Sequence, residues 1–226
     1  MMESIKTLND YGMEVTSGII LGLDTDSADT EGRLKDFVTL SGIPTLTMNL
    51  LQALPKTPLW DRLAREGRLA DDPALESNVR FLRPYDEVVG TWRRCVAYAY
   101  DPERLFARFA HQVEATYRNR MTVPARGRLT LTNLIFAARF AVRLAYHVGF
   151  KADYRRHFWR VAGRALRYGR IEEFFGMGFV AHHLIEFSRE ALRGDQNASF
   201  YSALTKRRAE EAAAWHRGEA DLRKSA

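Results

Sequence analysis

The chain of 226 residues is 46% hydrophobic and 27% charged, values ordinary for a globular domain, which exclude a chain that is disordered overall. Its single cysteine, Cys95, excludes a disulfide framework and favours a reducing, cytoplasmic setting. Met1–Asn9 lacks an apolar run and predicts no secretory signal, and the net charge of +6 equals that of one stretch, Lys151–Arg170, with seven basic residues and only Asp153 acidic.

The first seventy residues predict a parallel strand–helix–strand–helix unit. Apolar runs indicate two strands, and apolar residues at helical spacing indicate a helix after each of them. The elements are expected at Glu14–Gly22 (strand), Glu31–Leu40 (helix), Thr45–Ala53 (strand) and Leu59–Arg65 (helix). Strands this apolar are typical of parallel sheets that are buried on both faces.

Two parallel strands do not make an independently stable sheet, because both outer edges stay open. No further convincing strand follows in the chain. We therefore expect these strands to be the end of a larger sheet, whose other strands lie upstream or in a partner chain.

Two motifs of this unit resemble those of a known family. The run Gly18–Gly22 with Leu23-Asp24-Thr25 resembles the G-x-I-x-G-x-x-E signature on the fifth strand of the radical SAM partial barrel, with Thr25 in place of the glutamate. The segment Gly42–Leu69, which ends Glu-Gly-Arg-Leu, looks like the sixth strand and following helix of the cobalamin-binding branch. Later stretches resemble the C-terminal helical domain of that branch: Asn78–Phe81, Tyr100–Arg108 and Ala181–Ile185.

The resemblance, which is to the hopanoid-methylase-like branch, implies a fold and a division into domains. The expected fold is an α/β fragment plus an all-α part: the last two strand–helix units of a radical SAM partial TIM barrel, followed by a helical domain. The barrel end would occupy residues 1–70, the helical domain residues 71–200, and a polar tail residues 201–226.

The resemblance also implies cofactors and site residues. The family uses SAM, a [4Fe–4S] cluster and cobalamin, but one cysteine cannot supply the three cluster thiolates of a C-x-x-x-C-x-x-C loop, so no catalytic residue and no metal ligand is assigned to this chain. By position, Gly18, Ile20, Gly22 and Leu51 are candidate contacts of SAM, and Asp24 (with Asp26 as the alternative) is the candidate to replace the missing glutamate. The competing interpretation is that the glycines only relieve the packing of helix on strand.

From Asp71 onward only helices are predicted. They are expected at Asp86–Tyr100, Pro102–Tyr117, Thr130–Val148, Tyr154–Tyr168 and Ile171–Leu192, with a loop at Pro124–Gly127 and a frayed tail from Ser199. Cys95 lies on an apolar helix face and is expected to be a plain buried thiol. Thr130–Val148 is strongly apolar but carries two arginines, each costing about 3 kcal/mol at mid-bilayer, so we expect a buried core helix rather than a transmembrane span.

The helix Tyr154–Tyr168 is basic and amphipathic. Four arginines recur on one side, Arg156, Arg160, Arg164 and Arg167, while the apolar side is expected to hold Phe158, Trp159, Val161, Ala162, Ala165 and Leu166. Such a helix suits an anionic membrane surface, with Trp159 and Tyr168 at the interface; a solvated basic face packed on the core is the alternative. No nucleic-acid-binding motif is present.

The adjacent histidines His182 and His183 on the last predicted helix are weaker candidates for a metal site, because neighbouring side chains on a helix point about 100° apart. His182 and Glu186 lie four residues apart and could pair or bind a metal, but no third ligand follows in the sequence, so we expect an ordinary core or surface histidine.

Two hypotheses result. The first is the C-terminal part of a cobalamin-dependent radical SAM methyltransferase that acts on a lipid such as a hopanoid, held peripherally at the inner membrane and dependent on a missing N-terminal barrel and cobalamin domain in cis or in trans. The second is a non-enzymatic helical module that binds a partner or an anionic membrane through its basic helix.

Overall fold

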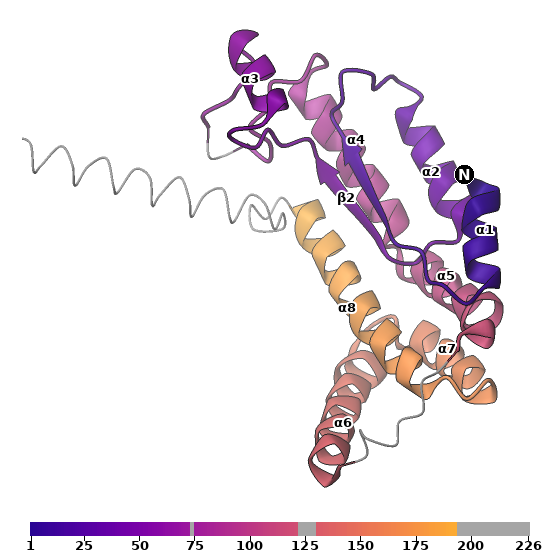
Figure 1. Cartoon of the computed structure of the whole chain (residues 1–226). Helices are drawn as coiled ribbons and strands as arrows, with labels where there is room; N and C mark the ends of the chain where they lie inside the picture. Colours follow the sequence, from indigo (N-terminus) through magenta and orange to yellow (C-terminus); the bar gives the residue numbers. More distant parts are fainter. Residues whose placement is uncertain (73–74, 122–129, 194–226) are drawn as a thin grey trace, which may run out of the picture.

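The computed structural model describes residues 1–72, 75–121 and 130–193. Within these ranges the chain forms a two-stranded parallel sheet with helices on one side of it, and a helical part beyond (Figure 1). The elements are α1 (Met2–Asp10), β1 (Ser17–Leu21), α2 (Thr30–Ser41), β2 (Leu46–Leu50), α3 (Pro58–Arg65), α4 (Tyr85–Ala99), α5 (Pro102–Ala115), η1 (Tyr117–Asn119), α6 (Leu131–Leu144), η2 (Ala145–Lys151), α7 (Arg155–Arg167) and α8 (Ile171–Arg193).

The predicted strand–helix–strand–helix unit is confirmed. β1 and β2 pair in parallel from Ser17 opposite Leu46 to Leu21 opposite Leu50, and both strands are shorter than the apolar runs that predicted them. α2 connects them and ends at Gly42, which adopts a left-handed conformation (φ 62°) that glycine accepts without strain. Thr57 caps α3 by accepting a hydrogen bond from the Trp60 N–H. The barrel to which the resemblance assigned these units stays an expectation.

One face of the sheet forms the core with α4. Leu21, Leu46, Met48 and Leu50 are buried, and α4 packs against both β2 and α2. The other face carries Ile20, whose side chain is 51% exposed. The expectation that both faces of these apolar strands are buried is therefore wrong for the part of the chain that the structure describes.

The helical part continues the same core. α5 packs on α7, and α8 packs on α4 and α7 (Figure 1). Large side chains fill the space between these helices: Tyr100, Leu105, Phe109, Phe158 and Ile185 are fully buried. The four helices predicted at Asp86–Tyr100, Pro102–Tyr117, Tyr154–Tyr168 and Ile171–Leu192 are found within about two residues of their expected ends, the usual uncertainty of a helix terminus.

Three expectations about the secondary structure fail. α1 was not foreseen, and Leu69 and Val79 form an isolated antiparallel bridge where only helices were expected. The predicted buried core helix at Thr130–Val148 is wrong: residues of α6 up to Phe140 are exposed, and Leu144 is its buried residue. The physical reason is that α6 packs mainly against α8 and η2 in the described part of the chain.

Other expectations are not addressed by the structure. The loop at Pro124–Gly127 and the tail, 201–226, lie outside the described residues, and the division at residue 70 stays a prediction. Among the helices of the described ranges, none is long and apolar enough to cross a membrane.

Candidate functional site

The exposed face of the sheet is the first candidate site. In the parallel register Gly18 lies opposite Thr47 and Ile20 opposite Asn49, and alternation puts these four residues on one face. Gly18 and Thr47 are exposed, Ile20 is exposed, and Asn49 is half-buried. A Cβ added at Gly18 would meet only the Thr47 hydroxyl, at an ordinary 3.4 Å. Packing within the described chain therefore does not require glycine here, and the backbone is open to close approach from outside.

The two edges of the sheet differ. The hydrogen bonds from Ser17 N to Thr45 O (3.2 Å) and from Leu51 N to Leu21 O (2.8 Å) show which residues direct their backbone groups toward the neighbouring strand. Because this direction alternates along a strand, the backbone N–H and C=O groups of Leu46 and Met48 point to the outer edge of β2. The Met48 carbonyl accepts a hydrogen bond from the indole N–H of Trp92 in α4, and the Leu46 carbonyl accepts one from the hydroxyl of Tyr100, the residue that follows α4. The outer edge of β2 is thus covered.

The outer edge of β1 is not covered in the same way. By the same alternation Gly18 and Ile20 direct their backbone N–H and C=O groups away from β2, and no bond from another described segment reaches them. An edge with free donors and acceptors is a template for a further strand. The sheet can therefore grow on the β1 side only.

The chain after β2 is held extended by side chains. Asn78 bonds both backbone groups of Ala53, its Oδ1 accepting from the N–H (2.9 Å) and its Nδ2 donating to the carbonyl (2.8 Å). The Ser77 hydroxyl donates to Leu51 O at 2.6 Å. Leu51, a predicted SAM contact, is buried in a small cluster with Ala53, Leu63 and Val79. The stretch Asn78–Phe81, noted for its family resemblance, thus shapes the end of β2.

Gly22 has a packing role that Gly18 lacks. Its φ is +90°, and an added Cβ would lie 2.4 Å from the ring of Phe81. Its N–H donates to Asp26 Oδ2 at 2.7 Å, which turns the chain sharply after β1. For Gly22 the interpretation that glycine relieves packing is therefore supported on physical grounds.

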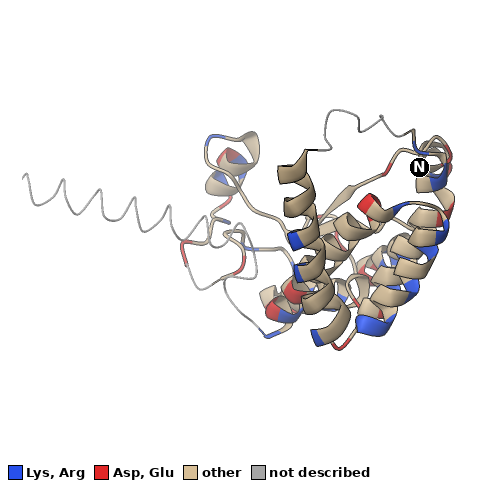
Figure 2. Ribbon diagram, turned by 90° about the horizontal axis from the view of Figure 1, so that it is seen from below, with Lys and Arg blue, Asp and Glu red and all other residues tan. Residues whose placement is uncertain are grey.

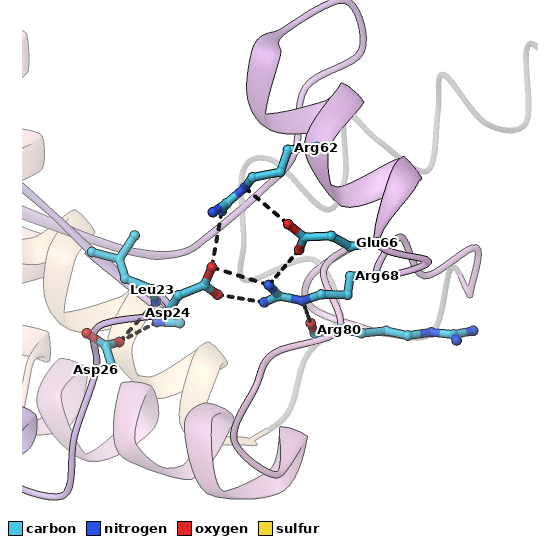
Figure 3. A network of polar contacts seen from close by, with 8 residues as sticks. Leu23, Asp24, Asp26, Arg62, Glu66, Arg68 and Arg80 are labelled. Atoms are coloured by element: carbon cyan, nitrogen blue, oxygen red, sulfur yellow. Dashed lines mark hydrogen bonds and ion pairs between the residues drawn. The ribbon is translucent and has the colours of Figure 1, made fainter.

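Asp24 belongs to an ionic network (Figure 3). Its two oxygens accept hydrogen bonds from Arg68 at 2.6 and 3.2 Å, and Arg62 lies 3.2 Å from one of them. Arg68 also bonds Glu66 at 3.0 Å and donates to the carbonyl of Arg80. The hydrogen bond from Arg68 lowers the pKa of Asp24 and raises that of Arg68. Asp24 thus tethers the loop after β1 to the chain after α3.

Sequence reasoning missed Arg68 and Arg62 as partners of Asp24. Arg68 stands in the Glu-Gly-Arg-Leu ending that carried part of the resemblance, so the signal was present. What the sequence lacked was the information that residues 44 positions apart meet.

The arginine side of α7 is exposed. Arg156, Arg160, Arg164 and Arg167 are all exposed, and Arg164 lies 3.4 Å from Glu114 of α5. Figure 2 shows Lys and Arg positions, in blue, along several helices of the molecule. Phe158, Val161, Ala162 and Ala165 are buried as expected. Trp159 and Leu166, also expected on the apolar side, are 45% and 62% exposed.

The side chains of Cys95 and His182 make contacts within the fold. Cys95 is buried, and burial raises the pKa of its thiol to about 11. His182 Nδ1 lies 2.5 Å from the Tyr154 hydroxyl, and burial lowers the pKa of the imidazole. Glu186 bonds Arg189 at 3.2 Å instead. Across the described ranges, no three side chains gather as a metal site.

The residues present fit one of the three implied cofactors in part. The exposed backbone at Gly18 and Ile20 can lie flat against a ligand, as contact with the adenosyl group of SAM requires. The cluster does not fit this chain, because its one cysteine is a buried residue of α4 and cannot supply three thiolates.

Comparison with known proteins gives three results. A family model described as "Domain of unknown function (DUF4070)" matches residues 57–197. The chain is 48% identical over 202 residues to a hopanoid C-2 methylase of Rhodopseudomonas palustris, covering 89% of this chain and 38% of that protein. It is 27% identical over 225 residues to an uncharacterized methyltransferase of Synechocystis sp., covering 93% of this chain and 40% of that protein. No solved structure matches the chain significantly.

The chain therefore spans about two fifths of the length of these curated relatives. The resemblance to the hopanoid-methylase-like branch, drawn from short motifs, is confirmed by a match over most of the chain.

Proposed function

Because this chain belongs to the family defined by the domain of unknown function DUF4070, we propose that it is the C-terminal part of a cobalamin-dependent radical SAM methyltransferase. Both matched relatives are named as methylating enzymes, and the chain corresponds to less than half of each. In this proposal the rest of the enzyme supplies the cluster, the cobalamin site and the remaining strands, in cis or in trans.

The observation that carries the proposal is the asymmetry of the sheet. A parallel sheet is almost always covered on both faces, and here one face and one edge are bare in the described chain. β2 is finished by Trp92 and Tyr100, whereas β1 offers free backbone groups at Gly18 and Ile20. This is the geometry of the last two strands of a larger sheet, with β2 as the final one.

This chain would contribute a wall and a closing element rather than reacting groups. Gly18 and Ile20 would lie against SAM, which would supply the methyl group when bound. Gly22 and the tether between Asp24 and Arg68 would hold the loop at the carboxyl end of β1, where ligands of parallel sheets bind. The substrate class we propose is a lipid such as a hopanoid, supported by the name of the relative with 48% identity.

A chimera tests the proposal. The matching segment of the Rhodopseudomonas palustris hopanoid C-2 methylase is replaced by this chain, and methylated hopanoid is measured in cells. We expect activity to be retained, and to fall at least tenfold with Gly18→Val, which fills the open face.

Gly32→Ala on α2 is the matched control, because an added Cβ there meets nothing within 4 Å. A chimera that folds and yet forms no methylated product would contradict the proposal and favour the non-enzymatic helical module.

A further inference from the structure

α6 presents an unusual exposed surface. A helix that is apolar on nearly all sides is normally covered by protein or by lipid. On α6, Leu131 is 74% exposed, Ile135 52% and Val142 70%, and Leu134 is exposed beside them. At 100° per residue these four side chains fall within one arc of about 100°. They form a stripe that faces away from Leu144, the buried residue of the helix.

The stripe continues into the following turns. Tyr146 and Phe150 of η2 are 59% and 69% exposed. Phe150 packs edge-on against Trp159 of α7 with ring centroids 6.1 Å apart, and the Trp159 indole donates to Gly149 O at 2.8 Å. The docking surface is defined here as Leu131, Leu134, Ile135, Val142, Tyr146 and Phe150. It ends on an aromatic pair, a composition favoured where apolar matter meets water.

The charge along this segment of the chain is of one sign. Between Thr130 and Tyr168 the only acidic residue is Asp153, which is paired with Arg189 at 2.6 Å. In the same range, Arg164 is the one basic residue with an ion pair among the described residues. The others are Arg139, Arg143, Lys151, Arg155, Arg156, Arg160 and Arg167. Arg139 and Arg143 lie on α6 itself, both next to the same edge of the stripe.

We propose that this surface docks onto an anionic lipid bilayer, with the docking surface entering the boundary between headgroups and acyl chains and the surrounding arginines contacting lipid phosphates. A bilayer of this kind offers an apolar layer beneath a negatively charged one, which matches the two features found together. A second copy of the chain would bring the same positive charges together, so self-association is disfavoured. The inference goes beyond the proposed function, because none of these residues lies at the sheet.

Vesicle flotation tests the docking. The purified chimera, in which the rest of the enzyme completes the sheet, is mixed with vesicles of phosphatidylcholine alone or with 30% phosphatidylglycerol, and the bound fraction is measured. We expect binding to the anionic vesicles only. Ile135→Ser/Val142→Ser should weaken it at least tenfold, whereas Leu40→Ser/Leu82→Ser should change it less than twofold, since those leucines are equally exposed (74% and 68%) but lie outside the surface.

The charges are tested in the same assay. Arg156→Gln/Arg160→Gln should weaken binding several-fold, and Arg33→Gln/Arg80→Gln, which removes the same charge elsewhere, should have a smaller effect. Equal binding to uncharged vesicles, or equal effects of the two pairs, would overturn the anionic part of the proposal. Circular dichroism melting of each variant chimera confirms that the surface changes leave the fold intact.

Two further readouts separate a membrane from a protein partner. Lipids brominated near the headgroup should quench the fluorescence of the chain, and Trp159→Phe should remove most of the quenching. Dimerisation in solution that Ile135→Ser/Val142→Ser abolishes would overturn the proposal in favour of a second copy. Failure of the chimera to float with anionic vesicles would overturn the proposal too, because the rest of the enzyme would then cover α6; this result does not depend on whether the chimera methylates hopanoids.

Discussion

Gly18 and Gly22 lie four residues apart and fit the same signature, yet the structure gives them different surroundings. Gly22 has a positive φ and touches Phe81, while Gly18 is extended and faces open space. The two glycines differ in backbone φ and in the side chain that an added Cβ would meet. The effect of a substitution on stability should therefore show which glycine the fold needs and which one is available to a ligand.

Gly22→Ala should lower the free energy of unfolding by about 2 kcal/mol or more, because alanine at positive φ is strained and its Cβ would overlap the Phe81 ring. Gly18→Ala should leave stability unchanged or raise it by up to about 1 kcal/mol, since alanine loses less conformational entropy than glycine in a strand. Chemical denaturation of the chimera measures both. Equal losses would mean that Gly18 is also a packing position.

Cys95 should be unreactive in the folded chain. Burial raises the pKa of its thiol to about 11, so the thiolate is scarce at pH 8, and the sulfur is 1% exposed. Ellman's reagent should label it only after denaturant is added. Rapid stoichiometric labelling of the native protein would show that the α4–α2 contact opens readily.

At the scale of elements, ionic and polar side chains connect segments that the backbone hydrogen bonds of the sheet do not connect. Asp24 links the end of β1 to the chain after α3, and Asn78 fixes the chain after β2. Trp92 of α4 and Tyr100, the residue that follows α4, finish the outer edge of β2. These bonds decide where the carboxyl ends of both strands point, which is where a ligand would bind.

The tether between Asp24 and Arg68 should make stability depend on acid pH. The pKa of Asp24 is lowered below its ordinary 3.8, so its stabilising effect is complete well above that value and is lost as the pH falls toward the folded-state pKa. Asp24→Asn should cost up to about 1 kcal/mol at pH 7, as expected for a partly exposed ion pair.

The loss caused by Asp24→Asn should shrink as the pH falls below 3.8 toward the lowered pKa of the folded state, because the carboxylate of the parent protein then becomes protonated. Asp36→Asn is the control, because Asp36 is exposed and has no ion pair in the described ranges. Unfolding by urea across this pH range measures the difference. A cost that is independent of pH would show that Asp24 acts through packing rather than charge.

At the scale of the whole molecule, two surfaces are left bare: the sheet at Gly18 and Ile20, and the stripe of α6. They lie on different parts of the molecule (Figure 1) and differ in kind. The first offers backbone donors and acceptors, which suit a strand. The second offers apolar side chains amid arginines, which suit lipid.

The chain on its own should aggregate or melt without cooperativity, because its β1 edge can pair with other copies. Ile20→Lys should raise its solubility several-fold, since a charge on the open face opposes such pairing. Leu40→Lys, at an even more exposed apolar position away from the edge, should help much less. Light scattering and thermal unfolding measure both effects.

A sharp melting transition of the monomeric parent chain would contradict this prediction and the incomplete sheet on which it rests. In the chimera, by contrast, Ile20→Lys should be harmful, because the lysine would lie where the missing strands and SAM are expected.

The sequence by itself determined the local elements and the family. Runs of apolar residues located both strands, helical periodicity located α4, α5, α7 and α8, and the motifs at Gly18–Gly22 and Gly42–Leu69 indicated the relatives that the comparisons then matched. Such signals are local, since each depends on residues within one or two turns of chain.

Only the tertiary structure decided which surfaces stay open. That one face of the sheet is bare, that α6 is exposed rather than buried, and that Asp24 meets Arg68 across 44 residues all depend on how distant segments pack. An apolar helix has the same sequence pattern whether protein or lipid covers it, so periodicity could not locate the cover of α6. What covers α6 depends on the assembled surface, and in the described part of the chain α6 packs mainly against α8 and η2, which leaves its other sides exposed.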